Sequence, residues 1–216
     1  MENVFIKNLK ETGYLHNHAR MYLASYVVHF RRVKWQAGAK FFLTHLLDGD
    51  IASNNFSWQW VAGTFSRKPY IFNRENVERF TNGMYCQVCP AFGRCDFEGT
   101  YEQLAEKLFT DTTIEREVRL TIPPAVIREY SEIPDESLVW VTLDSLSDCS
   151  PAKRQFPDAP SVFVFDQHWL SAELPSYKRI AFICECLAEL PDTEIWFGET
   201  AAVLQGRARM TNVGAI

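Results

Sequence analysis

A stretch rich in glycine, proline and cysteine divides this chain into two parts with different patterns. Residues 81–111, which begin TNGMYCQVCPAFGRCDFEG, carry turn-forming residues at close intervals, and such clusters interrupt helices and strands. Before them, apolar residues recur at helical spacing. After them, short β-branched and apolar runs alternate with helical stretches. The sequence therefore predicts a mainly α-helical fragment followed by a small α/β, partly Rossmann-like segment.

Three segments are expected: a helical fragment over 1–80, a cysteine-containing loop and short helix over 81–111, and a partial α/β segment over 112–216. In the first segment, TGYLHNHARMYLASYVVHF predicts a helix with Thr12 as its N-cap, and AGAKFFLTHLLDGD predicts a second helix that stops at Gly49. SNNFSWQWVAG predicts a short helix after these. In the last segment, SLVWVTLDSL, SVFVFDQHWL and TEIWFGE predict strands of a parallel sheet.

Composition and charge narrow the class of protein. Hydrophobic residues make up 47% of the 216 positions, which is enough for a packed core. Residues 1–80 hold 11 lysines and arginines against 6 acids, whereas residues 81–216 hold 11 against 21. The first part suits a polyanionic partner, and a plain solvated surface is the alternative. The apolar runs are too short for a membrane span, and no secretory signal precedes them, so a cytoplasmic location is expected.

Two short stretches combine polar groups with large aromatic surfaces. In the first stretch, TGYLHNHARM, a helix would place Asn17, Arg20 and Met21 at i, i+3 and i+4, so that they share one face. The other stretch, HLLDGDIASNNFSWQW, offers carboxylate acceptors, amides that both donate and accept, and two tryptophans. Such a set suits a flat ring whose edge carries N–H and C=O groups, and a flavin isoalloxazine is a ring of this kind.

Four motifs carry a resemblance to a known family. TGYLHNHARM, the tryptophan at Trp35, LLDGDIASNN and WQWVAGT closely resemble the C-terminal FAD-binding domain of the DNA photolyase/cryptochrome family, in the same order and with the same spacing. The resemblance runs from about Glu11 to about Asn73. It implies a flavoprotein that uses light-driven electron transfer for pyrimidine-dimer repair in damaged DNA, or for signalling.

The resemblance also implies roles for single residues. Arg20 would pair with Asp48 beside the isoalloxazine ring, and Asn54 would face flavin N5. Trp58 and Trp35 would be members of the electron-hopping tryptophan chain. The cofactor-binding positions implied in this way are Asn17, Arg20, Asp48, Asp50 and Asn54, and those implied for the substrate are Trp60, Met21 and Asn17.

The resemblance is incomplete, which raises the question of a partner. In the family, a large helical region precedes the motifs and contacts the flavin diphosphate, and here about eleven residues precede them. Residues 112–216 resemble the opening of the family's N-terminal α/β domain, which comes first in the family. The chain is thus expected to be a truncated, rearranged relative completed by a second chain or by a homo-oligomer. The alternative is a non-catalytic interaction or scaffold subunit that keeps the fold without flavin.

The cysteine loop has a spacing that suits a metal. Cys86, Cys89 and Cys95 form C-x₂-C-x₅-C, and close thiolates at turns bind Zn²⁺ or an iron–sulfur cluster. The loop also resembles the corresponding region of iron–sulfur bacterial photolyases. Because such sites normally take four ligands, a partner chain would have to supply the fourth. An iron–sulfur cluster, zinc and no metal all stay open from the sequence.

Overall fold

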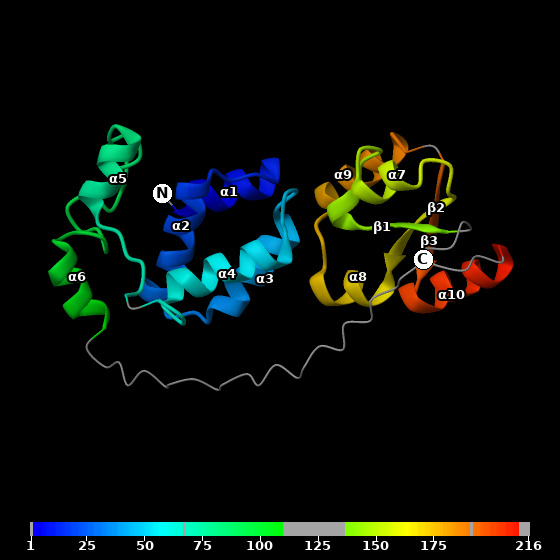
Figure 1. Cartoon of the computed structure of the whole chain (residues 1–216). Helices are drawn as coiled ribbons and strands as arrows, with labels where there is room; N and C mark the ends of the chain where they lie inside the picture. Colours follow the sequence, from blue (N-terminus) through cyan, green and yellow to red (C-terminus); the bar gives the residue numbers. More distant parts are fainter. Residues whose placement is uncertain (1, 67, 110–136, 191, 212–216) are drawn as a thin grey trace. The chain divides into compact units, whose positions relative to one another are not determined.

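The computed structural model describes residues 2–66, 68–109, 137–190 and 192–211. They form two compact units, one helical and one α/β, which divide between residues 114 and 115, outside the described ranges. Figure 1 shows the helical unit in blue to green and the α/β unit in yellow-green to red. This confirms the predicted fold class. None of the helices in the described part is both long and apolar enough to cross a membrane.

The helical unit owes its boundaries to local caps. Asp50 caps the helix that follows it, which ends at Gly63 in the left-handed conformation (φ 77°). Asn73 caps the next helix, and Thr100 with Gln103 forms a capping box at the last one. The elements are α1 Glu2–Thr12, α2 Asn17–Ser25, a π-helix Tyr26–Phe30, α3 Trp35–His45, α4 Ile51–Ala62, α5 Arg74–Thr81 and α6 Tyr101–Leu108.

The start of the predicted first helix was wrong. Thr12 is the last residue of α1 rather than an N-cap, because Gly13 takes a left-handed φ of 72° and ends that helix. A side chain at Gly13 would also press on Leu47, since a Cβ there would lie 2.6 Å from the Leu47 Cγ. His16 caps α2 instead, and its Nδ1 accepts from the His18 N–H at 3.3 Å. The second predicted helix, α3, ends at His45 rather than at Gly49.

The cysteine loop packs on the helical core. That core gathers buried side chains from α1 to α5, and Phe97, Tyr85, Cys86 and Cys95 pack against or within it. The Arg74 N–H donates to the Phe97 carbonyl at 2.8 Å, which fixes the loop to the start of α5. The loop is therefore part of the helical unit in space.

The α/β unit is built on a three-stranded parallel sheet, as the sequence predicts, and the structure shows that the strands lie side by side in chain order. One face, through Phe163, packs on Ile183 and Leu187 of α9, and the other, through Val162, packs on Leu204 of α10. The elements are β1 Val139–Val141, a 3-10 helix Leu143–Ser145, α7 Pro151–Gln155, β2 Ser161–Asp166, α8 Gln167–Glu173, α9 Tyr177–Ala188, β3 Thr193–Gly198 and α10 Thr200–Thr211.

Asp166 ties two helix starts to the carboxyl end of β2. Its Oδ1 accepts from the His168 and Trp169 N–H groups at 2.8 and 2.9 Å. Its Oδ2 accepts from the Thr200 N–H and hydroxyl at 2.9 and 2.7 Å. These donors, the Thr200 hydroxyl first among them, hold the pKa of the carboxyl far below its usual range.

A π-helix at the end of α2 carries a buried histidine. His29 is 4% exposed, and its Nε2 donates to the Val61 carbonyl of α4 at 2.8 Å. Its ring meets Phe109 edge to face at 5.3 Å. Burial lowers the pKa of His29; the Val61 hydrogen bond opposes this shift and the nearby Arg32 charge adds to it. The ring is therefore a neutral link between the π-helix, α4 and the end of α6.

Stability of the helical unit is expected to fall below about pH 6.5. Since the pKa of His29 is lowered in the folded protein, the unfolded chain binds more protons, and the unfolding free energy falls as the pH drops through the unfolded pKa. Urea unfolding at several pH values between 8 and 5 measures the slope of the unfolding free energy against pH. His29→Gln keeps an N–H donor and should flatten this slope. Equal slopes in wild type and His29→Gln would contradict the assignment.

Candidate functional site

A cavity of about 430 Å³ opens among α2, α3, α4 and the turn before α4. This volume lies within the range of small-molecule sites, about 300–1,000 Å³. All of the residues expected to contact cofactor or substrate line it, although they come from separate elements. They are Asn17, Arg20, Met21, Asp48, Asp50, Asn54 and Trp60, and Trp58, which was implied for the electron path, lines the cavity as well.

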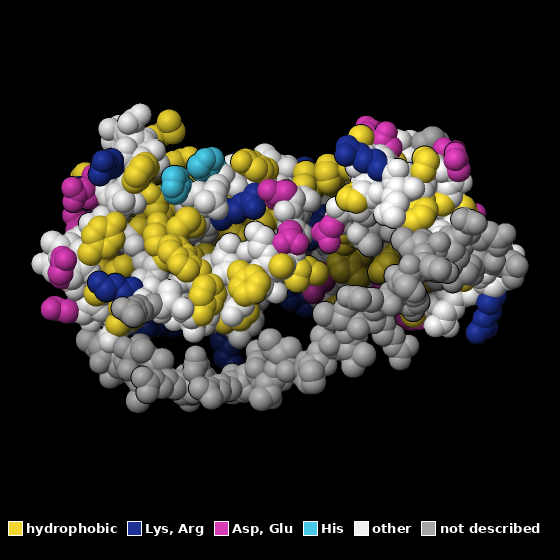
Figure 2. Space-filling view, in the orientation of Figure 1, with side chains coloured by type: hydrophobic (Ala, Val, Ile, Leu, Met, Phe, Trp, Pro, Cys, Tyr) yellow, Lys and Arg dark blue, Asp and Glu magenta, His cyan; other side chains and the backbone are white. Residues whose placement is uncertain are grey.

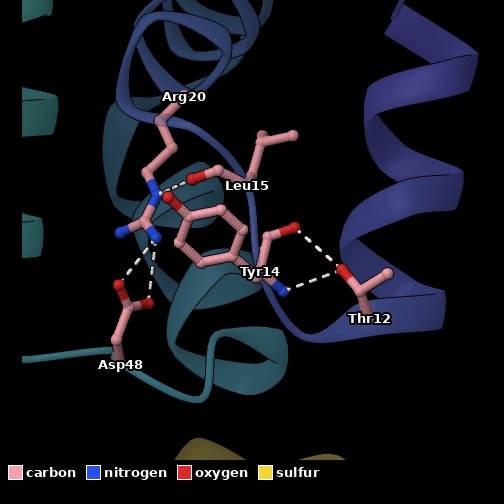
Figure 3. A network of polar contacts seen from close by, with 5 residues as sticks. All are labelled: Thr12, Tyr14, Leu15, Arg20 and Asp48. Carbon is pink, nitrogen blue, oxygen red and sulfur yellow. Dashed lines mark hydrogen bonds and ion pairs between the residues drawn. The ribbon is translucent and has the colours of Figure 1, made fainter.

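An ion pair holds one polar wall of the cavity. The Arg20 Nη2 donates to both carboxylate oxygens of Asp48, at 2.9 and 2.8 Å. Its Nε donates to the Leu15 carbonyl at 2.6 Å, and Figure 3 shows these contacts with Tyr14 beside them. The Tyr14 ring lies 5.5 Å from the guanidinium, and its backbone N–H donates to the Thr12 hydroxyl at 3.1 Å. Four contacts therefore orient the Arg20 side chain before any ligand arrives.

The exposure of this pair indicates its role. The side chain of Asp48 is 53% exposed and that of Arg20 is 23% exposed. A pair so accessible to water contributes about 0–1 kcal/mol to stability. Its effect is to fix a donor-rich and an acceptor-rich group side by side at the cavity, which suits a ligand that offers both kinds of group.

The first turn of α4 supplies two further polar groups. Asp50 is the N-cap, and its Oδ1 accepts from the Ser53 N–H at 2.6 Å. Asn54 is 8% exposed, and its Nδ2 donates to the Ala39 carbonyl of α3 at 3.0 Å. Because that bond uses the amide nitrogen, the carbonyl oxygen of Asn54 is the atom available to a ligand. Asp50 likewise has its second oxygen available.

Trp58 forms the apolar floor of the cavity. It is 2% exposed and meets Phe42 of α3 edge to face, with ring centroids 4.9 Å apart. Its indole N–H is buried and finds no acceptor among the described residues. A buried donor without a partner costs about 1–3 kcal/mol. This orphaned donor is the kind of feature that an acceptor on a bound ligand satisfies.

The mouth of the cavity is aromatic. Trp60 is 41% exposed and lies 5.3 Å from the Tyr70 ring. Phe56 and Phe65 are 62% and 58% exposed, and their rings meet edge to face at 6.3 Å. Figure 2 shows hydrophobic side chains gathered on this unit over α2 and α4. The sequence reasoning missed both phenylalanines, although Phe56 lies four residues before Trp60 and thus shares its helix face.

The predicted residues differ in how well they join the site. On α2, the Asn17 Nδ2 lies 3.9 Å from the Met21 sulfur, as the helical spacing predicts. Trp35 does not line the cavity; it begins α3 and packs, partly buried, against the core. It lies one helical turn before Gly38, and Gly38 lies against the ring of Trp58.

The cysteine loop brings its three thiols around one cavity. Cys86, Cys89 and Cys95 are free thiols around a second cavity of about 190 Å³. Burial raises the pKa of Cys86, and the charge of Glu78 adds to this, so the neutral thiol is favoured. Within the described ranges, no group of three or more histidines, cysteines or acids is arranged to hold a metal ion. The structure thus supports neither an iron–sulfur cluster nor zinc there.

The cavity fits part of a flavin dinucleotide by its chemistry. It offers a flat apolar floor, acceptors from Asp50 and Asn54, and a fixed guanidinium, which match a planar ring edged by N–H and C=O groups. A diphosphate matches it less well. Arg20 is the cation among the described residues that line it, and Asp48 already neutralises this charge. The residues present therefore suit the isoalloxazine end of FAD.

Comparison with known proteins confirms the resemblance. Residues 5–92 match the family model described as the FAD binding domain of DNA photolyase, which supports FAD as the cofactor. A deoxyribodipyrimidine photo-lyase from Streptomyces griseus is 48% identical over 59 residues, which are 27% of this chain and 13% of that protein. The one from Escherichia coli K12 is 42% identical over 71 residues, 32% of this chain and 15% of that protein.

A photo-lyase of the same name from a Synechococcus strain is 43% identical over 70 residues, 32% of this chain and 14% of that protein. The chain therefore matches only a small part of the length of these relatives. No solved structure gives a significant match to the chain.

Two substitutions at Asp50 separate its capping role from a ligand role. Asp50→Ala is expected to lower the free energy of unfolding by about 1 kcal/mol, because α4 loses its N-cap. Asp50→Ser should recover most of this loss, since serine is also a good cap. Urea unfolding measures both variants. Equal stability of the two variants would contradict the capping role, while a flavin affinity that stays low in Asp50→Ser would indicate that the second oxygen binds the ligand.

Proposed function

We propose, from the similarity of residues 5–92 to the FAD-binding domain of DNA photolyase, that the helical unit binds FAD and takes part in light-driven repair of pyrimidine dimers in DNA. One observation carries this proposal. Seven side chains expected from the motifs to contact flavin or substrate, on α2, on α4 and in the turn before α4, line a single cavity together with Trp58.

The polar wall and the floor would hold the isoalloxazine ring. Arg20 and Asp48 present a fixed donor and acceptor, and the contacts to Leu15 and Tyr14 keep the guanidinium in place. Asn54 is anchored to α3 through its nitrogen, which aims its carbonyl oxygen as an acceptor for the ring N–H expected at flavin N5. An amide at this position, rather than an acid, suits a reduced anionic flavin because it adds no like charge.

A bound reduced flavin would supply the photochemistry, which is a light-driven transfer of one electron to the dimer and its return. The chain contributes orientation and a path for reduction of the cofactor. Trp58 would be the first ring on this path, because it forms the floor of the cavity. Trp35 continues the path, one helical turn from the residue on which Trp58 rests.

The aromatic mouth suits a base turned out of the duplex. Trp60 is half-exposed at the edge of the cavity, and Met21 lines the same cavity from α2. Aromatic faces bind unstacked bases by stacking, and a damaged base costs less to extrude than an intact pair. The excess of 11 lysines and arginines over 6 acids in residues 1–80 favours contact with the phosphate backbone.

A second protein chain, or a second copy of this one, is part of the proposal. The described residues that line the cavity carry the charges of Arg20, Asp48 and Asp50, which sum to a net negative charge. A diphosphate needs cations or backbone N–H groups, and leaving its charges unpaired in a partly closed site is costly. Groups from outside this cavity are therefore expected to complete the dinucleotide site.

The ultraviolet–visible spectrum of the protein purified without air tests the proposal. Flavin bands, followed by light-dependent loss of dimers from irradiated oligothymidine, are the expected result with or without added partner. The proposal would be contradicted if the protein showed aromatic absorbance alone, both as purified and when repurified after incubation with FAD and cell extract. That result would favour the alternative function, a non-catalytic interaction subunit that keeps the fold without flavin.

Replacement of Trp58 tests the electron path. Trp58→Phe is expected to lose most of the light-driven reduction of bound flavin, because phenylalanine is much harder to oxidise, while the cavity floor keeps an aromatic ring. Trp35→Phe should slow the same step. Trp140→Phe is the matched control, since Trp140 is 44% exposed on β1 of the other unit. An unchanged photoreduction rate in Trp58→Phe would rule out this role.

A further inference from the structure

A glycine in the middle of α3 is unfavourable by local propensity. Gly38 is buried and helical, the fourth residue of Trp35–His45. Glycine at such a position costs about 0.5–1 kcal/mol relative to alanine, because it loses more backbone freedom on folding. Its φ is not in the left-handed region, so no turn requires it. The reason for glycine must therefore lie in its packing.

That reason is the ring of Trp58. A Cβ at position 38 would lie well inside van der Waals contact of Cη2 and Cζ3 of Trp58, and 3.0 Å from Cε3. The indole thus rests directly on the backbone of α3. It cannot simply swing aside, because Trp58 is 2% exposed and Phe42 holds it edge-on from the same helix. A side chain at 38 would displace the ring by about 1 Å or more before ordinary contact is restored.

The same contact relates Trp58 to the second tryptophan. Trp35 and Gly38 are at i and i+3 of one helix, so they lie on neighbouring positions of one face. The Trp58 ring therefore lies against the turn of α3 that follows Trp35. It also stays in the floor of the cavity formed with Asn54 on α4.

We propose that Gly38 is a positioning residue for Trp58: the missing Cβ seats the indole against α3, and so sets both the floor of the cavity and the gap between the two tryptophans. The first half of this proposal concerns packing alone. The second half rests on the proposed function, because the gap matters only if an electron crosses it. Gly38 itself contacts no reacting atom.

Gly38→Ala tests the proposal, with Gly206→Ala as the matched control. Both glycines lie inside helices, but a Cβ at Gly206 of α10 meets nothing within 4 Å. Gly38→Ala is expected to slow photoreduction per bound flavin severalfold, because the methyl group displaces the Trp58 ring and changes the gaps that the electron crosses. Gly206→Ala should leave the rate unchanged. A rate in Gly38→Ala equal to wild type would overturn the positioning role.

A cofactor-independent measurement keeps the two proposals separable. In urea unfolding, Gly38→Ala should lower the transition midpoint in the wild-type background and lower it much less when combined with Trp58→Phe, whose smaller ring leaves room for the methyl group. Equal losses in both backgrounds would overturn the inference. If wild type binds no flavin but this coupling is present, the seating of Trp58 by Gly38 stands and only the electron path falls with the proposed function.

The double variant also covers failure to fold. If Gly38→Ala alone does not fold and Gly38→Ala with Trp58→Phe does, the clash with the indole is the cause, as proposed. If neither folds while Trp58→Phe alone does, another contact makes glycine necessary and the inference is wrong.

Discussion

The helical unit depends on how closely α4 approaches α3. Two contacts set this approach: the Trp58 ring against Gly38, and the Asn54 amide bonded to the Ala39 carbonyl. Both come from one face of α4, and they meet neighbouring residues of α3. One contact is apolar and the other polar. If either helix slid, the protein would lose a buried hydrogen bond and gain a void at the same time. The cavity floor therefore has a fixed position.

Much of the site could be predicted because part of it lies on one helix and the rest follows from the resemblance of the motifs. Asn17, Arg20 and Met21 needed only a helical period, and the motif order brought Asp48 into the same set. Where helices begin was harder. Thr12 looks like an N-cap, yet it is the last residue of α1, which Gly13 brings to an end. The next helix, α2, begins only after His16. Composition alone does not tell a cap from the end of a preceding helix.

Features that depend on tertiary packing were not predictable. The π-helix that carries His29 has no local signature; it is stabilised by the Val61 carbonyl of α4 and by Phe109 after α6. The cysteine loop is a second example. Its spacing suits a metal, whereas only the fold shows that Cys86 packs against the core, where burial favours the neutral thiol. The spacing of cysteines can be read from the sequence, whereas the protonation of each thiol depends on burial and nearby charge in the fold.

The charges around the cavity bear on how a dinucleotide would be completed. Arg20 is oriented by Leu15 and neutralised by Asp48, so it offers hydrogen bonds rather than net positive charge. Asp50 is committed through one oxygen to the N-terminus of α4, where the helix dipole favours its negative charge. Neither acid can give way to a phosphate without the loss of a structural contact. The polar wall therefore suits a hydrogen-bonding ring rather than a phosphate, and a diphosphate would have to lie where other groups supply cations or N–H donors.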